Sequence, residues 1–412
     1  MKLRQRLAYG LLGAPLAMAA LPVYIHTPKL YGEEFGLGLA LTGLLLLGSR
    51  AVDTLQDPWL GRLADAMQQR PGGWPLLMGI AAVSLGLAYL ALFNPPAMQR
   101  EVLAAWFAVS LVLVYTAHSA LNITYLAWGA RASEDSHERT RLVACREGFA
   151  LFGVILASLL PMLQSERSWL LFSLCFAALL MPAVWILLRH APLPGPAVFA
   201  PQGLLQPLRH RPFRRLALLF LLNGLAIAIA ATLSLFYIDD VLRLEPYSGA
   251  FLALYFLSGA ASLPLWLRLA RRWGKILSWL AGTLLAVTGF VWAVRLGAGD
   301  LLPYAIICVL SGAALGADLA LPAAIAADII PRREHGRAAS YFGIWSLIGK
   351  LVLALAAGLA LPLLAGLGYV PGDLAGLTAL AFLYAGIPCL IKLLSAGLLL
   401  RWRDSLEVNH AL

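Results

Sequence analysis

Apolar runs of about 20 residues, the length a helix needs to cross a bilayer, recur along almost the whole chain. This recurrence limits the possible folds more than any other feature, because a chain of such runs has to bury them in lipid or against one another. Hydropathy predicts twelve runs, six in each half. The predicted spans are residues 6–26, 37–62, 74–94, 102–129, 145–164, 168–189, 214–237, 247–268, 276–297, 302–329, 338–365 and 375–400.

The composition agrees with a protein that crosses a membrane many times. Apolar residues make up 61% of the 412 residues and charged residues only 13%, whereas a soluble domain carries about a quarter of charged residues. The four cysteines lie inside apolar segments without paired spacing, so we interpret them as small hydrophobic residues rather than disulfides or metal ligands. The expected fold class is an all-α membrane protein.

Lysine and arginine are distributed unevenly between the two sides of the predicted spans. Of the 31 residues, 22 fall on one side, 5 fall on the other, and Arg50, Arg146, Lys350 and Lys392 lie within spans. The positive-inside rule places the richer side, with both termini, in the cytoplasm. This distribution explains the net charge of +10, and we therefore expect no nucleic-acid partner.

A division into two halves follows from a polar stretch in the middle of the chain. The least hydrophobic segment follows the sixth span, and it predicts a first half at 1–190, a cytoplasmic linker at 191–212 and a second half at 213–412. Each half contains six predicted spans. A short internal repeat supports this division, since the segment from Pro58 to Asp65 resembles the segment from Pro264 to Arg271, 206 residues later.

Three charged residues in the second span break the apolar pattern. Arg50, Asp53 and Asp57 are spaced at i, i+3 and i+7 and so share one face of a helix. Each charge costs about 2.5–3.5 kcal/mol near the centre of a membrane helix, and such residues usually face a site for an ion, a proton or a polar solute. Two structural alternatives remain, namely that Asp57 lies at a helix end in water and that Arg50 only neutralises Asp53.

The second half also contains ionisable residues within its spans. Lys350 lies about 12 residues into its span, too deep to reach either surface, so it needs an internal partner. Asp53 or Asp57 is the candidate partner, and a purely structural role in a wet cavity is the alternative. Tyr341 and Trp345 precede Lys350 at helical spacing and fit either stacking on a solute or ordinary packing. Asp318 lies in the middle of its span and is expected to face a cavity, as a solute ligand or at a hinge.

Two motifs identify a family resemblance. Gly61-Arg-Leu-Ala-Asp65, followed by Arg70, resembles the loop signature of the major facilitator superfamily, in which Gly61 would permit close helix approach and Asp65 would pair with a helix end or an arginine. The pattern Arg50-x-x-Asp53-x-x-x-Asp57-Pro58 resembles the glycoside–pentoside–hexuronide:cation symporters, the melibiose permease family. Further stretches that are similar to this family are 122–125, 137–141, 318–328 and 337–350.

The resemblance implies a fold and a mechanism. The fold is twelve transmembrane helices in two pseudo-symmetric six-helix halves, with solute bound near the midplane and moved by alternating access. The implied cation site consists of Asp53, Asp57, Gln56 and Ser119. Oxygen ligands of this kind suit a hard cation such as Na⁺. Two close carboxylates can instead share a proton, so coupling to Na⁺ and coupling to H⁺ both remain open.

The sequence departs from the family at the sugar site. The acids that bind sugar in the family correspond to Pro15 and Asn122, and the neighbouring aromatic position is Leu126, with Trp128 close by. A sugar or glycoside is the expected solute, and a lysolipid, another amphiphile or a proton-coupled non-sugar solute is the alternative. The candidate substrate-binding or coupling residues are Arg50, Asn122, Trp128, Arg146, Asp318, Tyr341, Trp345 and Lys350.

Other classes of protein receive less support. We find no His-Glu-x-x-His motif, no glycine loop for phosphate and no plausible Ser/His/Asp set, so an enzyme is not expected. A non-transporting receptor or scaffold is a further alternative. We expect a monomer in the inner membrane with lipid and a small solute as partners, no transition metal, and no cofactor other than the coupling ion.

Overall fold

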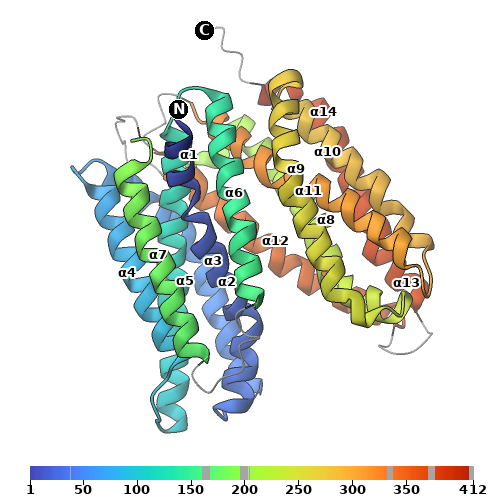
Figure 1. Cartoon of the computed structure of the whole chain (residues 1–412), viewed down its shortest axis with the longest axis horizontal. Helices are drawn as coiled ribbons and strands as arrows, with labels where there is room; N and C mark the ends of the chain where they lie inside the picture. Colours follow the sequence, from blue (N-terminus) through green and yellow to red (C-terminus); the bar gives the residue numbers. More distant parts are fainter. Residues whose placement is uncertain are drawn as a thin grey trace. The chain divides into compact units, whose positions relative to one another are not determined.

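The computed structural model describes residues 1–37, 39–159, 168–194, 203, 205–331, 337–369 and 376–407, and every regular element in these residues is a helix (Figure 1). The end of the predicted span 145–164, part of the predicted linker 191–212, and the counted arginines Arg167, Arg332 and Arg333 lie outside the described residues.

The chain forms two compact units. The first comprises Met1–Pro207 and Ile330–Leu347, and the second comprises Leu208–Ile329 and Ile348–Leu412. The first unit therefore includes a segment that the sequence division assigns to the second half. This segment carries the first turns of α12 (Ala338–Gly366), so one helix contributes residues to both units.

The first unit contains seven of the helices in the described residues, together with a π-helical turn and the start of α12. In chain order these are α1 (Leu3–Gly10), α2 (Gly13–Lys29), η1 (Leu30–Glu34), α3 (Leu39–Gln68), α4 (Gly73–Phe93), α5 (Arg100–Arg131), α6 (Ser136–Leu159) and α7 (Ser168–His190).

The second unit contains the remaining long helices, with short 3₁₀ and π segments at several of their ends. In chain order these are η3 (Gln206–Arg209), α8 (Arg211–Phe236), η4 (Tyr237–Val241), η5 (Glu245–Tyr247), α9 (Ser248–Trp273), α10 (Lys275–Phe290), η6 (Val291–Arg295), α11 (Leu301–Ile329), the rest of α12, α13 (Leu377–Ala381), η8 (Phe382–Gly386), α14 (Ile387–Arg401) and α15 (Arg403–Leu406).

Membrane-spanning character is clear for much of this set. Among the described residues, nine helical stretches are long and apolar enough to cross a membrane by length and composition. The helix α3 is not one of the nine, and it is the helix that carries Arg50, Asp53 and Asp57. The count of twelve spans and the cytoplasmic placement of both termini stay predictions.

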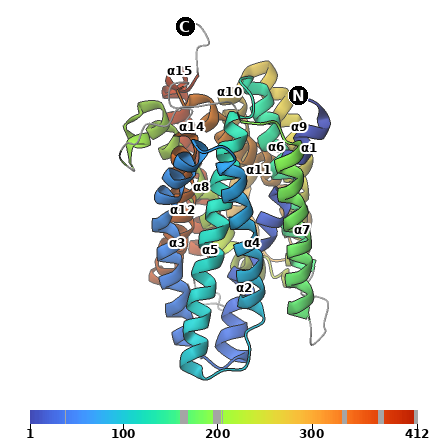
Figure 2. The ribbon, with the colours of Figure 1, turned by 90° about the vertical axis from the view of Figure 1, so that its left-hand side faces the viewer.

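Aromatic packing holds the first unit together around α4, α5 and α7, which lie beside one another in Figure 2. The ring of Tyr89 on α4 contacts the rings of Phe172 and Phe176 on α7, with the Tyr89 and Phe176 centroids 4.4 Å apart. Tyr9 of α1 and Tyr125 of α5 each donate a hydrogen bond to the other's backbone carbonyl. Buried hydroxyl groups are thereby satisfied within the bundle, as a membrane interior requires.

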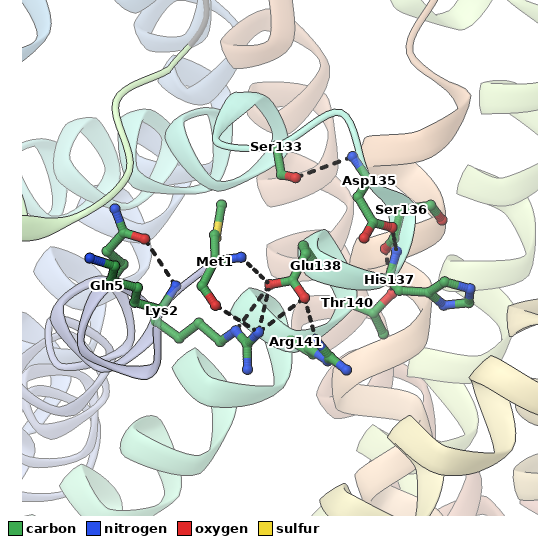
Figure 3. Close-up of polar contacts among 11 residues, drawn as sticks. Met1, Lys2, Gln5, Ser133, Asp135, Ser136, His137, Glu138, Thr140 and Arg141 are labelled. Atoms are coloured by element: carbon green, nitrogen blue, oxygen red, sulfur yellow. Dashed lines mark hydrogen bonds and ion pairs between the residues drawn. The ribbon is translucent and has the colours of Figure 1, made fainter.

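Charged residues fix the position of α1 against the start of α6. The guanidinium of Arg6 donates two hydrogen bonds of 3.0 Å to the carboxylate of Glu138, and Arg141 also binds this carboxylate (Figure 3). Glu138 lies in the first turn of α6, where a negative charge also favours the helix dipole.

The second unit relies on small residues and a tyrosine cluster. Gly312 and Gly316 of α11 lie against the backbone of α9 so closely that an added Cβ would collide with it. Such small residues let membrane helices approach each other. At another part of this unit, the hydroxyl groups of Tyr304 and Tyr384 are 2.8 Å apart, and the ring of Tyr237 stacks on Tyr384 with a centroid distance of 4.2 Å.

Candidate functional site

Both acids of α3, a helix of the first unit, are buried. Asp53 is 3% exposed and Asp57 is 0% exposed, and their spacing of four residues places both carboxylates on one face of the helix. Pro58 follows immediately within the same helix. Because proline has no N–H, it cannot donate the usual helical hydrogen bond to the carbonyl four residues earlier, that of Thr54. Side-chain acids and a freed carbonyl therefore occur in the same two turns.

Helix α5 supplies hydroxyl groups to these turns. The Ser119 hydroxyl donates a 3.1 Å hydrogen bond to Oδ1 of Asp53, and the Thr116 hydroxyl donates a 2.9 Å hydrogen bond to Oε1 of Gln56. Thr116 and Ser119 are one turn apart on α5, which packs along α3. We refer to Asp53, Gln56, Asp57, Thr116 and Ser119 as the α3–α5 cluster.

Of the Gln56 amide, the oxygen accepts a hydrogen bond and the nitrogen donates none among the described residues. Its Nε2 group is buried and has no acceptor among the described residues. A buried donor without an acceptor costs about 1–3 kcal/mol. Which end of an amide is oxygen is an assignment, and with the two ends exchanged the amide nitrogen would donate to Thr116 while the oxygen took the buried position. The cluster can therefore present an additional oxygen to a cation.

Arg50 lies one turn before Asp53 on α3 and is half-buried. Its guanidinium carbon lies 5.7 Å from the centre of the Tyr115 ring on α5, within the range of a cation–π interaction. Tyr115 directly precedes Thr116, so Arg50 is positioned by the same stretch of α5 that supplies the hydroxyl groups.

The loop-signature residues dock the start of α12 on α3. Asp65 is fully buried and accepts hydrogen bonds from the backbone N–H groups of Ala339 (2.9 Å) and Ser340 (2.8 Å) and from the Ser340 hydroxyl. A carboxylate at a helix start satisfies free N–H groups and the helix dipole. Gly61 lies directly against the Ala339 carbonyl, where a Cβ would not fit.

The start of α12 also contacts the backbone of Asp57. Gly343, one turn further along α12, lies directly against the backbone carbonyl of Asp57. Arg70, which follows the loop signature in the sequence, is exposed. The start of α12 is therefore held against α3 by the Asp65 hydrogen bonds and by close backbone contacts at Gly61 and Gly343.

The predicted solute residues of the first unit have different surroundings. Arg146 forms an ion pair with Glu147, its neighbour on α6. Asn122 lies half-buried on α5, one turn after Ser119. Trp128 is a packing residue, because its ring is buried against Trp74 and its indole N–H donates a 2.8 Å hydrogen bond to the Pro192 carbonyl. The role of Trp128 as a solute ligand stays a prediction.

The predicted residues of α12 are divided between the units. Tyr341 and Trp345 are buried in the part of α12 that belongs to the first unit, whereas Lys350 is half-buried in the part that belongs to the second. The predicted pairing of Lys350 with Asp53 or Asp57 stays a prediction.

A second buried polar group lies inside the second unit. Asp318 of α11 accepts hydrogen bonds from the amide of Asn223 (2.7 Å) and the indole of Trp279 (2.9 Å), and Nζ of Lys392 lies 2.9 Å from its Oδ2. Lys392 also donates to Oδ1 of Asn223 at 2.7 Å. We call these four residues the Asp318 centre. The sequence indicated Asp318 but not its three partners, which come from α8, α10 and α14.

Sequence reasoning also missed Glu147 and Thr116. An acid beside Arg146 and a hydroxyl residue one turn before Ser119 were visible signals for both. For metal binding, the described residues contain no group of three or more His, Cys, Asp or Glu side chains placed to hold a metal ion.

Comparison with known proteins gives a family model that covers most of the chain. A family model described as "MFS/sugar transport protein" matches residues 7–403. Among relatives, the inner membrane symporter YicJ of Escherichia coli (strain K12) is 24% identical over 162 residues, which are 39% of this chain and 35% of YicJ. A candidate glycoside/cation symporter of the same organism, YagG, is 24% identical over 156 residues, which are 38% of this chain and 34% of YagG. The matched region thus spans about a third of these relatives.

Solved structures show a similar fold. The crystal structure of a bacterial homologue of the iron transporter ferroportin, in an outward-facing state, matches with a TM-score of 0.77 at 17% identity, covering 98% of this chain and all of that chain. At this identity the similarity concerns the fold and not the cargo.

Proposed function

From the premise that the chain belongs to the MFS/sugar transport protein family, we propose that it is a cation-coupled symporter that moves a sugar or glycoside across the inner membrane by alternating access. The family is one of multi-pass membrane transporters and not of enzymes, and the fold is that of the major facilitator superfamily. The observation that carries the coupling to a cation is the contact of Ser119 with Asp53 beside the buried Asp57.

The composition of the α3–α5 cluster favours Na⁺ as the coupling ion. Two carboxylates, a carboxamide and two hydroxyl groups are oxygen ligands of the kind that hard cations prefer. A proton would need only one of the carboxylates and would leave the hydroxyl groups and the amide without a function in ion binding. Binding of Na⁺ would balance the negative charge of the buried acids. A higher affinity of Na⁺ for one conformation of the transporter than for the other would couple ion binding to the conformational cycle.

A sugar or glycoside is proposed as the solute because of the family and because YagG is named for glycosides. The half-buried Asn122, one turn from Ser119, would bind solute hydroxyl groups beside the ion. Arg146, which forms an ion pair with Glu147, would contribute to the solute site from α6.

The test is a thermal-shift measurement on the purified protein with sugars, glycosides and lysolipids, each with and without Na⁺, at pH 6 and pH 8. A ligand at 100 times its dissociation constant stabilises the folded state by about 2.7 kcal/mol. We expect Na⁺ to raise the melting temperature and to strengthen the response to one sugar class. The variant Asp57→Asn should lose the Na⁺ response, while Asp404→Asn, at an exposed position of α15, should keep it.

Two results would contradict the proposal. A stabilisation by lysolipids without any sugar response would indicate an amphiphile carrier. A response that follows pH and never Na⁺, in both the wild type and Asp57→Asn, would indicate a proton-coupled carrier that does not use the α3–α5 cluster.

A further inference from the structure

Thr116 differs from most threonines of the described helices in the partner of its hydroxyl group. The usual partner of a threonine hydroxyl inside a helix is a backbone carbonyl about one turn earlier in the same helix. The threonines that bond in this way, each to the carbonyl four residues earlier, include Thr54, Thr124, Thr140, Thr232 and Thr283. The hydroxyl of Thr116 donates instead to a side chain of another helix, Gln56 of α3, at 2.9 Å.

The carboxamide of Gln56 has a partner at one end only. Its Oε1 accepts the hydrogen bond from Thr116, whereas its Nε2 is buried and has no acceptor among the described residues. Gln56 lies one turn after Asp53 and directly before Asp57, so this nitrogen is buried in the same turns of α3 as both acids. A buried amide with an unmade hydrogen bond indicates a partner that binds there or an exchange of its two ends.

Exchanging the two ends of the amide gives the nitrogen an acceptor. A hydroxyl oxygen can accept as well as donate, so Nε2 of Gln56 can donate to Oγ1 of Thr116. The hydroxyl hydrogen of Thr116 is then free to donate to the Val112 carbonyl four residues earlier, as other helical threonines do. The amide oxygen takes the buried position in the α3–α5 cluster, where it is a suitable ligand for a hard cation.

We propose that Thr116 is a positioning residue of the cation site, whose hydroxyl turns the oxygen of the Gln56 carboxamide toward the ion. Thr116 acts through Gln56 and does not bind the ion, whereas Ser119, one turn later on α5, contacts Asp53 directly. The cation site implied by the family resemblance includes Gln56 and Ser119 but not Thr116. This inference rests on the proposed cation-coupled transport, and it adds the residue that determines how many oxygens the site offers.

The number of oxygen ligands also affects which cation binds best. Selectivity between two hard cations depends on the size of the site and on the number and flexibility of its ligands. Li⁺ is smaller than Na⁺ and is satisfied by fewer oxygens. Losing the oxygen of Gln56 should therefore weaken the binding of Na⁺ more than that of Li⁺, and the hydroxyl of Thr116 should favour Na⁺.

The test is a titration of the melting temperature of the full-length purified protein with NaCl or LiCl, in which choline chloride keeps the ionic strength constant. Thr116→Val removes the hydroxyl and nearly keeps the shape of the side chain. Groups that orient a metal ligand contribute about tenfold to a hundredfold to affinity, so the apparent affinity for Na⁺ should fall at least about tenfold. The ratio of Na⁺ to Li⁺ affinity should fall at least about threefold. Thr116→Ser keeps a hydroxyl and should restore both.

Thr124→Val is the matched control on the same helix. Thr124 is buried, and its hydroxyl donates to the Ala120 carbonyl. This variant should leave the affinity for Na⁺ and the ratio of Na⁺ to Li⁺ affinity unchanged. Equal losses in Thr116→Val and Thr124→Val would show that the Thr116 hydroxyl has only a structural role, and they would overturn the proposal.

Gln56→Met distinguishes an action through the amide from direct binding of the ion, since methionine has a similar length and no amide. In this background Thr116→Val should change the affinity for Na⁺ by less than about twofold, because effects of residues that act through one another are not additive. A further tenfold loss, by about the factor expected for one lost contact, would mean that Thr116 binds the ion itself. A melting temperature that falls equally with and without Na⁺ in Thr116→Val, at unchanged Na⁺ affinity, would mean that the hydrogen bond only joins α3 to α5. Either result would overturn the proposal.

The outcomes separate this inference from the proposed function. A response to Na⁺ that Asp57→Asn abolishes and Thr116→Val leaves unchanged would keep the Na⁺ symporter and remove the role of Thr116. A wild-type protein that responds to neither Na⁺ nor Li⁺ would remove both.

Discussion

The α3–α5 cluster and the Asp318 centre both bury acids, but they balance the charge in different ways. In the first unit, two carboxylates of one helix lie beside hydroxyl and amide groups of α3 and α5, and the nearby guanidinium of Arg50 lies over the ring of Tyr115. In the second unit, a single carboxylate is bound by an ammonium, an indole and an amide. Two acids beside hydroxyl and amide oxygens are suited to binding a cation, whereas an acid bound by a lysine needs no cation until the pair is opened.

The largest expected effect is on stability, in the second unit. Asp318→Asn or Lys392→Met alone should each reduce the free energy of unfolding by about 3–5 kcal/mol, because each leaves one buried charge without its partner. The double variant should lose much less than the sum of the two. Unfolding midpoints in detergent measure all three. Additive losses would show that the two side chains act independently and that the ion pair does not stabilise this unit.

The first unit should respond in the opposite way. Asp53→Asn removes one of two neighbouring carboxylates and keeps an oxygen for Ser119 to bind, so in Na⁺-free buffer the unfolding free energy should change by no more than about 1 kcal/mol. The stabilisation by Na⁺ should disappear. Melting temperatures with and without Na⁺ check both statements, with Asp404→Asn as the control. A large loss of stability without Na⁺ would mean that Asp53 is a structural ion-pair partner, and the contrast between the two regions would fail.

Much of the first region could be predicted from the sequence, and little of the second. The spacing of Asp53 and Asp57 requires a common helix face whatever the surrounding fold, and the likeness to known symporters adds Ser119 on another helix. The match of the family model to residues 7–403 confirms that likeness. The contacts of Ser119 with Asp53 and of Asp65 with a helix start are given by the structure, while the roles of these residues stay predictions.

The Asp318 centre could not be predicted because its members are far apart in the sequence. Lys392 is 74 residues from Asp318 and 169 residues from Asn223. Hydrophobic periodicity indicates which residues form a helix, but a helix that is apolar on nearly all sides does not reveal which neighbour it faces. Trp128 shows a contact that its position in the sequence did not indicate. Its indole N–H donates to the Pro192 carbonyl, and a tryptophan in a bundle satisfies packing and its N–H group at once. Its role as a solute ligand stays a prediction.

The smallest expected effect comes from a variant that changes only an uncharged ligand of the α3–α5 cluster. Ser119→Ala removes the hydroxyl that donates to Asp53 and would ligate the cation, while leaving every charge in place. A hydrogen bond to a charged group contributes about 1.5–3 kcal/mol, so the apparent affinity for Na⁺ should fall about tenfold to a hundredfold. Ser119→Thr keeps a hydroxyl and should restore most of the affinity for Na⁺.

Ser110→Ala changes a buried serine on the same helix, so it is the matched control and should leave the affinity for Na⁺ unchanged. Titration of the melting temperature with Na⁺ provides the measurement. Equal behaviour of the two alanine variants would show that the Ser119 hydroxyl is not a ligand of the cation, and Na⁺ binding would then be assigned to the carboxylates without it.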